Sequence, residues 1–527
     1  MHGVLPFILA MIVGIVLLEM LADKLRIAYP ILLVIAGLLI GFVPGVPLVT
    51  IHPDLIFFIF LPPLLFEASW SVSFKEMRKW WRMIGSFAFL VVFFTALSVA
   101  LATHWIIPGF TLALGFLLGG IVSPPDAVST GAITKFVKIP RATSAILEGE
   151  SLLNDASSLI VFRFALLAVV TGQFAWQPAT LSFVWMVLGG VGIGLGMGWL
   201  FIQAHKKLPT DAASDTIFTL VEPYALYWVA EQFHSSGVLA VVSGGLLLSS
   251  QRMTFLNSKS RIQGFSFWES FVFILNGLVF VIIGLALPEI VRGMQQTGIP
   301  LSTGIGYGVL VTVVLIVSRI ISSYIAMVAT LLFRPLKAPR THNRKRLWLL
   351  PLVMGWTGMR GVVSLAAALA IPVQLSDGID FPYRNLILFI TFIVILLTLV
   401  IQGLTLPGII SRSGLFREIE QAESHRTSRD QLRAGLRQHI YSFLKAKEES
   451  GLSNHAGFRQ MMRHWEDKMS QNDQGAMSQQ TKEIYLEMLE SQRAYLLELN
   501  RTTDIDEELL RNQFYQIDLE EERVRMI

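Results

Sequence analysis

Residues 146–162 read ILEGESLLNDASSLIVF, and this stretch decides the fold. It contains three carboxylates within eight residues, inside an apolar run long enough for a membrane helix. Glu148, Ser151 and Asp155 stand at i, i+3 and i+7, so they share one helix face. Three carboxylates this close in a dry core cannot all be ionised cheaply. The pattern therefore predicts a buried site where cations or protons neutralise some of them.

A helix interruption is predicted shortly before this stretch. Residues 117–136 read LLGGIVSPPDAVSTGAITKF, with two prolines immediately before Asp126. Because proline lacks a backbone donor and clashes with the preceding turn, the helix should break at residues 123–126. Such breaks are tolerated in a membrane only where they line a cavity or pack against protein. Acids within membrane spans are functional candidates by default, which adds Glu67 and Glu231.

Arginines inside apolar stretches can serve as partners for the buried acids. Arg319 lies in LIVSRIISSY and Arg360 in GWTGMRGVVSL, where exposure to lipid would be costly. Three glycines around Arg360 predict a second interrupted helix: Gly355, Gly358 and Gly361. Interrupted helices in oppositely oriented halves indicate a secondary transporter with inverted repeats. Arg163, eight residues beyond Asp155, has no assigned partner.

Composition separates the chain into two parts. Of its 527 residues, 53% are apolar and only 15% are charged, against about 25% charged in soluble proteins. Residues 1–411 contain 25 basic and 17 acidic residues, while residues 412–527 contain 17 and 21. We therefore predict a transmembrane domain over 1–411 and a cytoplasmic helical tail over 412–527. This composition excludes a large soluble enzyme, and the lack of cysteine excludes disulfides and thiolate sites.

The apolar segments predict an all-α polytopic membrane protein of about thirteen transmembrane helices. They lie near residues 3–22, 30–43, 54–71, 83–103, 110–134, 142–170, 180–204, 214–232, 236–250, 265–287, 302–333, 347–372 and 385–410. Alternate loops carry 20 basic residues on one side and 2 on the other. Since cytoplasmic loops are rich in Lys and Arg, the amino terminus is expected outside an inner cell membrane and the tail inside.

The ends of the chain carry fewer signals. The first residues lack the charged start and cleavage site of a signal peptide, so we expect a retained membrane helix. In the tail, residues 430–449 and 481–500 have apolar residues at three-and-four spacing, which predicts helices. No motif in the tail specifies an activity. The basic residues within 1–411 lie in separate loops and do not form one exposed patch, so we expect no nucleic-acid partner.

At this point the motifs resemble those of the monovalent cation/proton antiporters, the NhaP and sodium/proton-exchanger family. The resemblance is carried by EGESLLND at 148–155 and SPPDAVS at 123–129, with 29 positions between Asp126 and Asp155. Further matches are LPPLLFEA at 61–68, AEQFHSSGVLAVVSGGL at 230–246 and GMRGVVSLAAAL at 358–369. The resemblance covers residues 1–411. It implies a dimerisation part and a six-helix core, elevator-like alternating access, and a homodimer in lipid.

The resemblance also implies the ion site. Asp155 would bind the transported monovalent cation or the proton, with Asp126 as a further cation ligand and Ser151 beside them. The family pattern near the first acid is Ser-x-Thr-Asp-Pro, whereas Pro125 stands here at the Thr position and Ala127 at the Pro position. The threonine side chain is therefore absent, while the backbone carbonyl of Pro125 would still be available as a ligand. This departure leaves the preference among Na⁺, Li⁺ and K⁺ open.

Supporting residues follow from the same resemblance. Asn154 occupies the position that is Asn in electroneutral relatives and Asp in electrogenic ones. Glu150 would pair with Arg319, and Arg360 would compensate the helix ends at the second interruption. Glu67 matches an acid that helps to line the site through water.

The function expected from these observations is exchange of Na⁺, or of Li⁺ or K⁺, for H⁺ in pH and cation homeostasis. Carboxylates, hydroxyls and carbonyls suit hard cations. Asp155 cannot cross the membrane as a carboxylate without a bound ion, so it must carry either a proton or a cation. Exchange should therefore be one-for-one and electroneutral. No cofactor is expected.

Three other functions remain open. One is a potassium-preferring antiporter with the same cycle. Another is a channel, or a sensor that signals through the tail to an unknown regulator. The third is an intramembrane aspartyl protease using Asp126 and Asp155, although its usual G-x-G-D pattern is missing.

Overall fold

The computed structural model divides the chain into two compact units, Met1–Glu423 and Ser424–Ile527. The structure describes residues 4–25, 27–43, 53–72, 74–126, 131, 141–172, 176–256, 258–296, 298–333, 348–375 and 379–413, with scattered tail residues. Ala127 and nearly all of the predicted tail helices lie outside the described residues. The domain boundary predicted at residue 411 stays a prediction.

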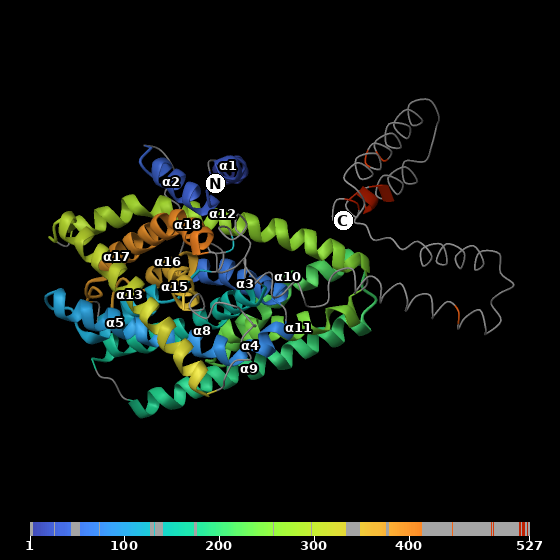
Figure 1. Cartoon of the computed structure of the whole chain (residues 1–527), viewed down its shortest axis with the longest axis horizontal. Coiled ribbons are helices and arrows are strands. Elements are labelled where there is room, and N and C mark those ends of the chain that lie inside the picture. Colours follow the sequence, from blue (N-terminus) through green and yellow to red (C-terminus); the bar gives the residue numbers. More distant parts are fainter. Residues whose placement is uncertain are drawn as a thin grey trace. The chain divides into compact units, whose positions relative to one another are not determined.

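The described residues of the first unit are mainly helical (Figure 1). Their bounds are α1 Val4–Leu25, α2 Tyr29–Gly41, α3 Pro53–Ser71, α4 Phe74–Ser86, η1 Phe87–Val91, α5 Val92–Ile106, α6 Leu112–Val122, α8 Arg141–Thr171, α9 Trp176–Lys207, α10 Ala212–Gln232, α11 Gly237–Phe255, α12 Ser258–Gln296, α13 Leu301–Phe333, α15 Leu350–Trp356, α16 Val362–Leu369, α17 Arg384–Leu397, η2 Thr398–Gln402 and α18 Gly403–Ser413. Each predicted span overlaps at least one of these helical segments, while residues 127–130 and 132–134 of the span predicted at 110–134 lie outside the described residues. Among the described residues, extended backbone pairing is limited to an isolated bridge between Gln374 and Asp380.

Within the described residues, seven helical stretches are long and apolar enough to cross a membrane. They are Pro6–Leu25, Met77–Ile106, Ile146–Thr171, Leu181–Lys207, Ser260–Gln295, Leu301–Ala329 and Arg384–Arg412. Shorter apolar helices accompany them at Tyr29–Gly41, Phe58–Ser71 and Leu112–Val122. The predicted all-α polytopic fold is therefore confirmed, whereas the number of thirteen crossings stays a prediction.

Side-chain caps mark the beginning of several helices. Thr111 accepts a hydrogen bond from the backbone of the first turn of α6, at 3.3 Å. Asp211 does the same for α10 at 2.8 Å, and Ser236 for α11 at 3.2 Å. These short polar side chains satisfy backbone donors that a helix start leaves unpaired, so the local sequence sets where these helices begin.

Small residues let α6 approach α5 closely. Gly115 and Gly119 lie on the side of α6 that faces Ala100 and Ala96 of α5. A Cβ atom at either glycine would lie within 2.9 Å of α5 backbone atoms. Close approach through small residues is a common way of packing helices in membranes. It holds α6 firmly, and with it the interruption that follows.

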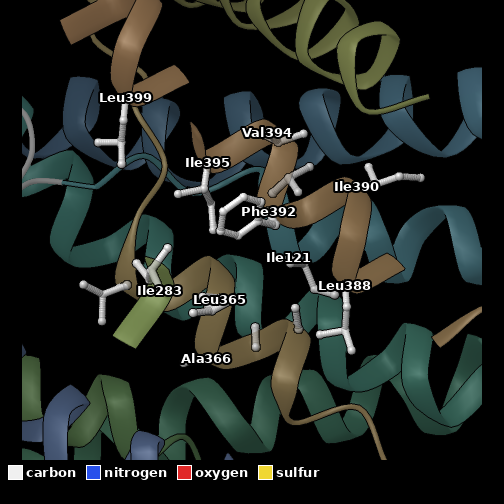
Figure 2. Close-up of a cluster of buried hydrophobic side chains, with 14 of the residues drawn as sticks. Ile121, Ile283, Leu365, Ala366, Leu388, Ile390, Phe392, Val394, Ile395 and Leu399 are labelled. Atoms are coloured by element: carbon white, nitrogen blue, oxygen red, sulfur yellow. The ribbon is translucent and has the colours of Figure 1, made fainter. Parts of the chain in front are cut away.

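An apolar core surrounds the second interrupted helix (Figure 2). Leu365 of α16 is buried together with Ile121 of α6, Ile283 of α12 and Ile395 of α17. Helices α6, α12 and α17 therefore meet around α16. Tight packing of this kind leaves little room for α16 to shift relative to α6.

Candidate functional site

Two helix interruptions cross in the interior of the first unit. Helix α6 ends at Val122, followed by non-helical residues up to Asp126. The other break separates α15 from α16 at residues 357–361. The backbone N–H of Asp126 donates to the carbonyl oxygen of Met359 over 2.7 Å. Both predicted helix breaks are therefore present in the described residues, and a backbone hydrogen bond joins them.

Arg360 occupies the end of α6. Its Nε donates to the carbonyl of Val122 over 2.7 Å and its Nη2 to that of Ser123 over 3.4 Å. A further guanidinium bond goes to the carbonyl of Gly358. The side chain is fully buried. Since the last carbonyls of a helix carry partial negative charge, the guanidinium satisfies them and offsets that charge.

The contacts of Arg360 reach beyond the expected ones. It was expected to compensate the helix ends at its own interruption, where it bonds to the carbonyl of Gly358, and two further side-chain bonds go to the end of α6. The crossing of the two breaks explains the difference, because it brings carbonyls from a distant part of the chain within reach.

The four predicted ion-binding residues lie together at this crossing. Asp155 of α8 is buried, Asp126 is half-buried, and the two carboxylates are close enough for their charges to interact. The Ser151 hydroxyl donates to the carbonyl oxygen of Pro125 over 3.3 Å. The site thus combines two carboxylates, one hydroxyl and one backbone carbonyl. These are oxygen donors of the kind that bind hard cations.

The Asp126 carboxylate lies directly against Gly361. A Cβ atom at this glycine would overlap the carboxylate oxygen Oδ2. Gly361 is also the residue that precedes α16. The first turn of a helix carries partial positive charge, so this position favours a negative group. Glycine is needed here because the acid and the backbone approach each other so closely.

Glu150 and Arg319 form a buried ion pair, as the resemblance implies. The Nη2 atom of Arg319 donates to Oε1 of Glu150 over 2.7 Å, and both side chains are 1% exposed. The pair joins α8 to α13. A Cβ atom at Gly358 would lie within 3 Å of atoms from both Arg319 and Arg360, so the two arginines meet over this glycine. Removing one partner of such a pair costs about 3–5 kcal/mol.

Asn154 lies between this ion pair and Asp155 along α8. It is fully buried, and neither Oδ1 nor Nδ2 has a hydrogen-bond partner among the described residues. Buried side-chain amides are normally hydrogen-bonded. The open donor and acceptor of Asn154 next to Asp155 therefore suit a polar ligand.

Glu148 departs from the prediction. It was expected in the dry core with Glu150 and Asp155, but its side chain is exposed and accepts a hydrogen bond from Ser144 over 2.7 Å. Glu67 of α3 is half-buried and within electrostatic range of Glu148. The shared helix face of Glu148 and Asp155 extends from the surface to the core, so its two acids have different surroundings.

Two polar groupings were missed by sequence reasoning. Arg163 of α8 donates through Nη2 to both carboxylate oxygens of Glu231 in α10, at 2.7 and 2.8 Å. The second grouping joins His205, Asp215 and Glu222. The rule that identified Glu231 as a mid-span acid applies equally to Glu222, which lies on the same predicted span.

Comparison with known families settles what kind of protein this is. A family model described as "Sodium/hydrogen exchanger, transmembrane" matches residues 7–412. The chain belongs to the sodium/hydrogen exchanger family. This is a family of membrane transporters, so the exchanger is not an enzyme, and its multi-pass membrane placement follows.

Individual relatives agree with the family model. The exchanger is 31% identical over 427 residues to the Na(+)/H(+) antiporter ApNhaP of Aphanothece halophytica, covering 79% of this chain and 76% of the relative. It is 34% identical over 391 residues to the sodium, potassium, lithium and rubidium/H(+) antiporter of Bacillus subtilis, covering 72% and 57%.

The fold of the exchanger matches a solved structure. The sodium proton antiporter MjNhaP1 from Methanocaldococcus jannaschii at pH 8 superposes with a TM-score of 0.61 at 17% identity. The match covers 78% of this chain and 98% of that protein.

Proposed function

We propose that this exchanger moves Na⁺ and H⁺ in opposite directions through one site at Asp155 and Asp126. The observation that carries the proposal is the pair of carboxylates at the crossing of two interrupted helices. The Ser151 hydroxyl and the Pro125 carbonyl complete a set of oxygen ligands. Such ligands suit a partly dehydrated monovalent cation. Asn154, with its open amide, supports the site from the next position on α8.

Exchange follows from the burial of Asp155. A charged carboxylate is costly inside a membrane protein unless it is paired. Glu150 has its partner in Arg319 and needs no transported ion. Asp155 has no such arginine among its hydrogen bonds in the described part of the chain. It therefore carries either a proton or a cation when the site moves, and competition between the two couples their transport one-for-one.

Ion preference follows from the donor set. The Aphanothece relative is named for Na⁺ and H⁺ and the Bacillus relative for four alkali cations. Pro125 removes the side-chain hydroxyl of the usual pattern and leaves a less specific carbonyl. Na⁺ is our first choice of substrate, with Li⁺ also carried. A K⁺-preferring exchanger is the second candidate, favoured by this loss of a ligand.

The cycle we propose is elevator-like, in a homodimer within the inner membrane. Residues 1–411 would form the transport domain, with a dimerisation part and a six-helix core, and residues 412–527 a cytoplasmic tail that can bind a regulator. The ratio of 20 to 2 basic residues between alternate loops supports an external amino terminus. Glu67 and Arg360 would support the site from α3 and from the second interruption.

Purified protein in proteoliposomes tests the function. Na⁺, Li⁺ and K⁺ are each added outside vesicles that hold a preset pH gradient, and dissipation of the gradient is followed by a fluorescent dye. Asp155→Asn should reduce exchange of every cation to the level of empty vesicles, because its amide cannot alternate between cation and proton.

A matched control comes from the same face of α8. Glu148→Gln removes an exposed carboxylate that is bonded to Ser144, so exchange should stay close to wild type. If cation-driven proton flux persists in Asp155→Asn, Asp155 is not the residue that binds the cation and the proton.

A further inference from the structure

A buried polar cluster lies outside the proposed ion site, where three helices meet. His205 is in the last turn of α9, and its Nδ1 lies 2.9 Å from Oδ1 of Asp215 in the first turn of α10. Its Nε2 lies 2.9 Å from Oε1 of Glu222, further along α10. Ser260, near the start of α12, donates to Oδ2 of Asp215 over 2.6 Å. The side chains of His205, Asp215 and Glu222 are at most 5% exposed.

The geometry requires two hydrogens in this cluster. Each short contact between a ring nitrogen and a carboxylate oxygen needs one hydrogen between the two atoms. A neutral imidazole supplies only one N–H. The second hydrogen is either on the ring, which makes it imidazolium, or on one of the carboxyl groups. In both cases the cluster holds one proton more than a neutral histidine beside two carboxylates.

Glu222 is the carboxyl group that shares this additional proton. Asp215 receives a hydroxyl bond from Ser260, which stabilises its carboxylate. The second oxygen of Glu222, Oε2, is buried and has no hydrogen-bond partner among the described residues. A bare carboxylate oxygen is costly in such a place. The additional proton therefore lies between Oε1 of Glu222 and Nε2 of His205.

A proton, and not a metal ion, suits the space between these atoms. Among the described residues, no group of three or more His, Asp and Glu side chains is placed to hold a metal ion, and 2.9 Å is the length of a direct N–H···O hydrogen bond. The imidazole packs against two aromatic rings, with its centroid 5.6 Å from that of Phe218 and 5.1 Å from that of Phe255. A proton is the ligand of the right size.

Other charged side chains on the surrounding helices do not enter the cluster. Lys206, Lys207, Asp211 and Glu269 are exposed, while Arg252 and Arg261 donate to backbone carbonyls elsewhere. Tyr224 of α10 donates to the carbonyl of Ile59. His205, Asp215 and Glu222 thus face one another and no further described charge.

We propose that His205 and Glu222 form a second proton-binding site, separate from Asp155, which holds α9 against α10 and α12 while the proton is bound. When the proton leaves, two lone pairs face each other across 2.9 Å and two carboxylates are buried without a compensating cation. Both effects are repulsive. Deprotonation therefore loosens the contact between α9 and α10.

Helix α10 also offers a connection to the ion site. The same helix carries Glu231, which is ion-paired with Arg163 on α8, the helix of Asp155. A shift of α10 at Glu222 would thus reach α8 through this pair. The consequence for transport, slower exchange at alkaline pH, rests on the proposed function, whereas the proton site itself does not.

Glu222→Gln tests the site in the full-length protein. The glutamine amide has the same shape and donates permanently to Nε2 of His205, so it mimics the protonated state and cannot titrate. The unfolding temperature of the detergent-purified wild type should fall as pH rises and the site loses its proton, because the folded state then keeps two carboxylates buried without a cation and the unfolded state does not. In Glu222→Gln this fall of the unfolding temperature should disappear. In proteoliposomes, the wild type should exchange more slowly at alkaline pH, and Glu222→Gln should not.

Two further variants make the test decisive. Asp211→Asn replaces an exposed carboxylate at the start of α10 by another good cap and should keep the wild-type pH dependence. His205→Gln removes the imidazole and should likewise abolish the fall of the unfolding temperature with rising pH. The proposal would be overturned if the unfolding temperature of Glu222→Gln still fell with pH as in the wild type. It would also be overturned if Asp211→Asn lost this fall to the same extent as Glu222→Gln. Because unfolding is measured without transport, this result does not depend on whether the protein exchanges Na⁺.

Discussion

At the scale of single residues, the position of Asp126 depends on the absence of a side chain at residue 361. The carboxylate lies against the backbone of Gly361, with the first turn of α16 beyond it. Its own backbone N–H is held by Met359 in the other interruption. The acid is therefore placed by two contacts to one short segment, and a single methyl group is enough to disturb it.

Gly361→Ala should displace this carboxylate and weaken cation binding. Overpacking of this kind costs about 1–3 kcal/mol, and we expect the KM for Na⁺ to rise on the order of tenfold, which corresponds to about 1.4 kcal/mol. KM is measured from pH-gradient dissipation at increasing Na⁺ concentration. Gly306→Ala is the control, because a Cβ atom there meets nothing within 4 Å. An unchanged KM in Gly361→Ala would contradict the proposed role of Asp126.

At the scale of helices, the ion pair between Arg163 and Glu231 joins α8 to α10. It is partly exposed, with 42% and 30% of the two side chains accessible. Glu231 also accepts a 3.3 Å hydrogen bond from the backbone of Gly237, at the start of α11. The pair thus connects the helix of Asp155 to a neighbouring group of helices. If α8 moves relative to α10 during exchange, this contact breaks and re-forms in each cycle.

We expect the pair to tune turnover and to have little effect on stability. A pair this exposed contributes at most about 1 kcal/mol. Arg163→Gln and Glu231→Gln should each change the exchange rate by up to about fivefold, and the double variant should resemble either single variant, because all three lose the same contact. Exchange rates and unfolding temperatures are measured for all four proteins. If the double variant instead shows the sum of the two single effects on exchange rate, the two residues act independently.

At the scale of the whole molecule, the charged side chains around the candidate ion site differ in whether another group of the protein compensates their charge. Glu150 is paired with Arg319, and Arg360 bonds to helix-end carbonyls. Asn154 is neutral. In the cycle that we propose, Asp155 is the acid whose charge changes when one ion replaces the other. A single negative charge that binds one positive ion at a time moves no net charge over a full cycle.

Exchange should consequently be insensitive to membrane potential. Proteoliposomes with an imposed potassium-diffusion potential, positive or negative inside, should dissipate a pH gradient with Na⁺ at equal rates. Each charge moved across 100 mV would change the driving force by about 2.3 kcal/mol, so an electrogenic cycle would be visible. A rate that follows the sign of the potential would rule out one-for-one exchange.

The sequence by itself determined the helices, both interruptions and the identity of the central motif. Apolar runs, proline pairs and glycine clusters act over a few neighbouring residues, so they can be read without a fold. Val122 ends α6 just before Pro124 and Pro125, and the glycines around Arg360 separate α15 from α16.

Only the tertiary structure decided which distant groups meet. It brings Arg360 to the end of α6, leaves Glu148 exposed, pairs Arg163 with Glu231 and encloses His205 between Asp215 and Glu222. Helix periodicity specifies the face on which a residue lies, but not what lies opposite that face. Partners far apart in the sequence are chosen by how whole helices pack against one another.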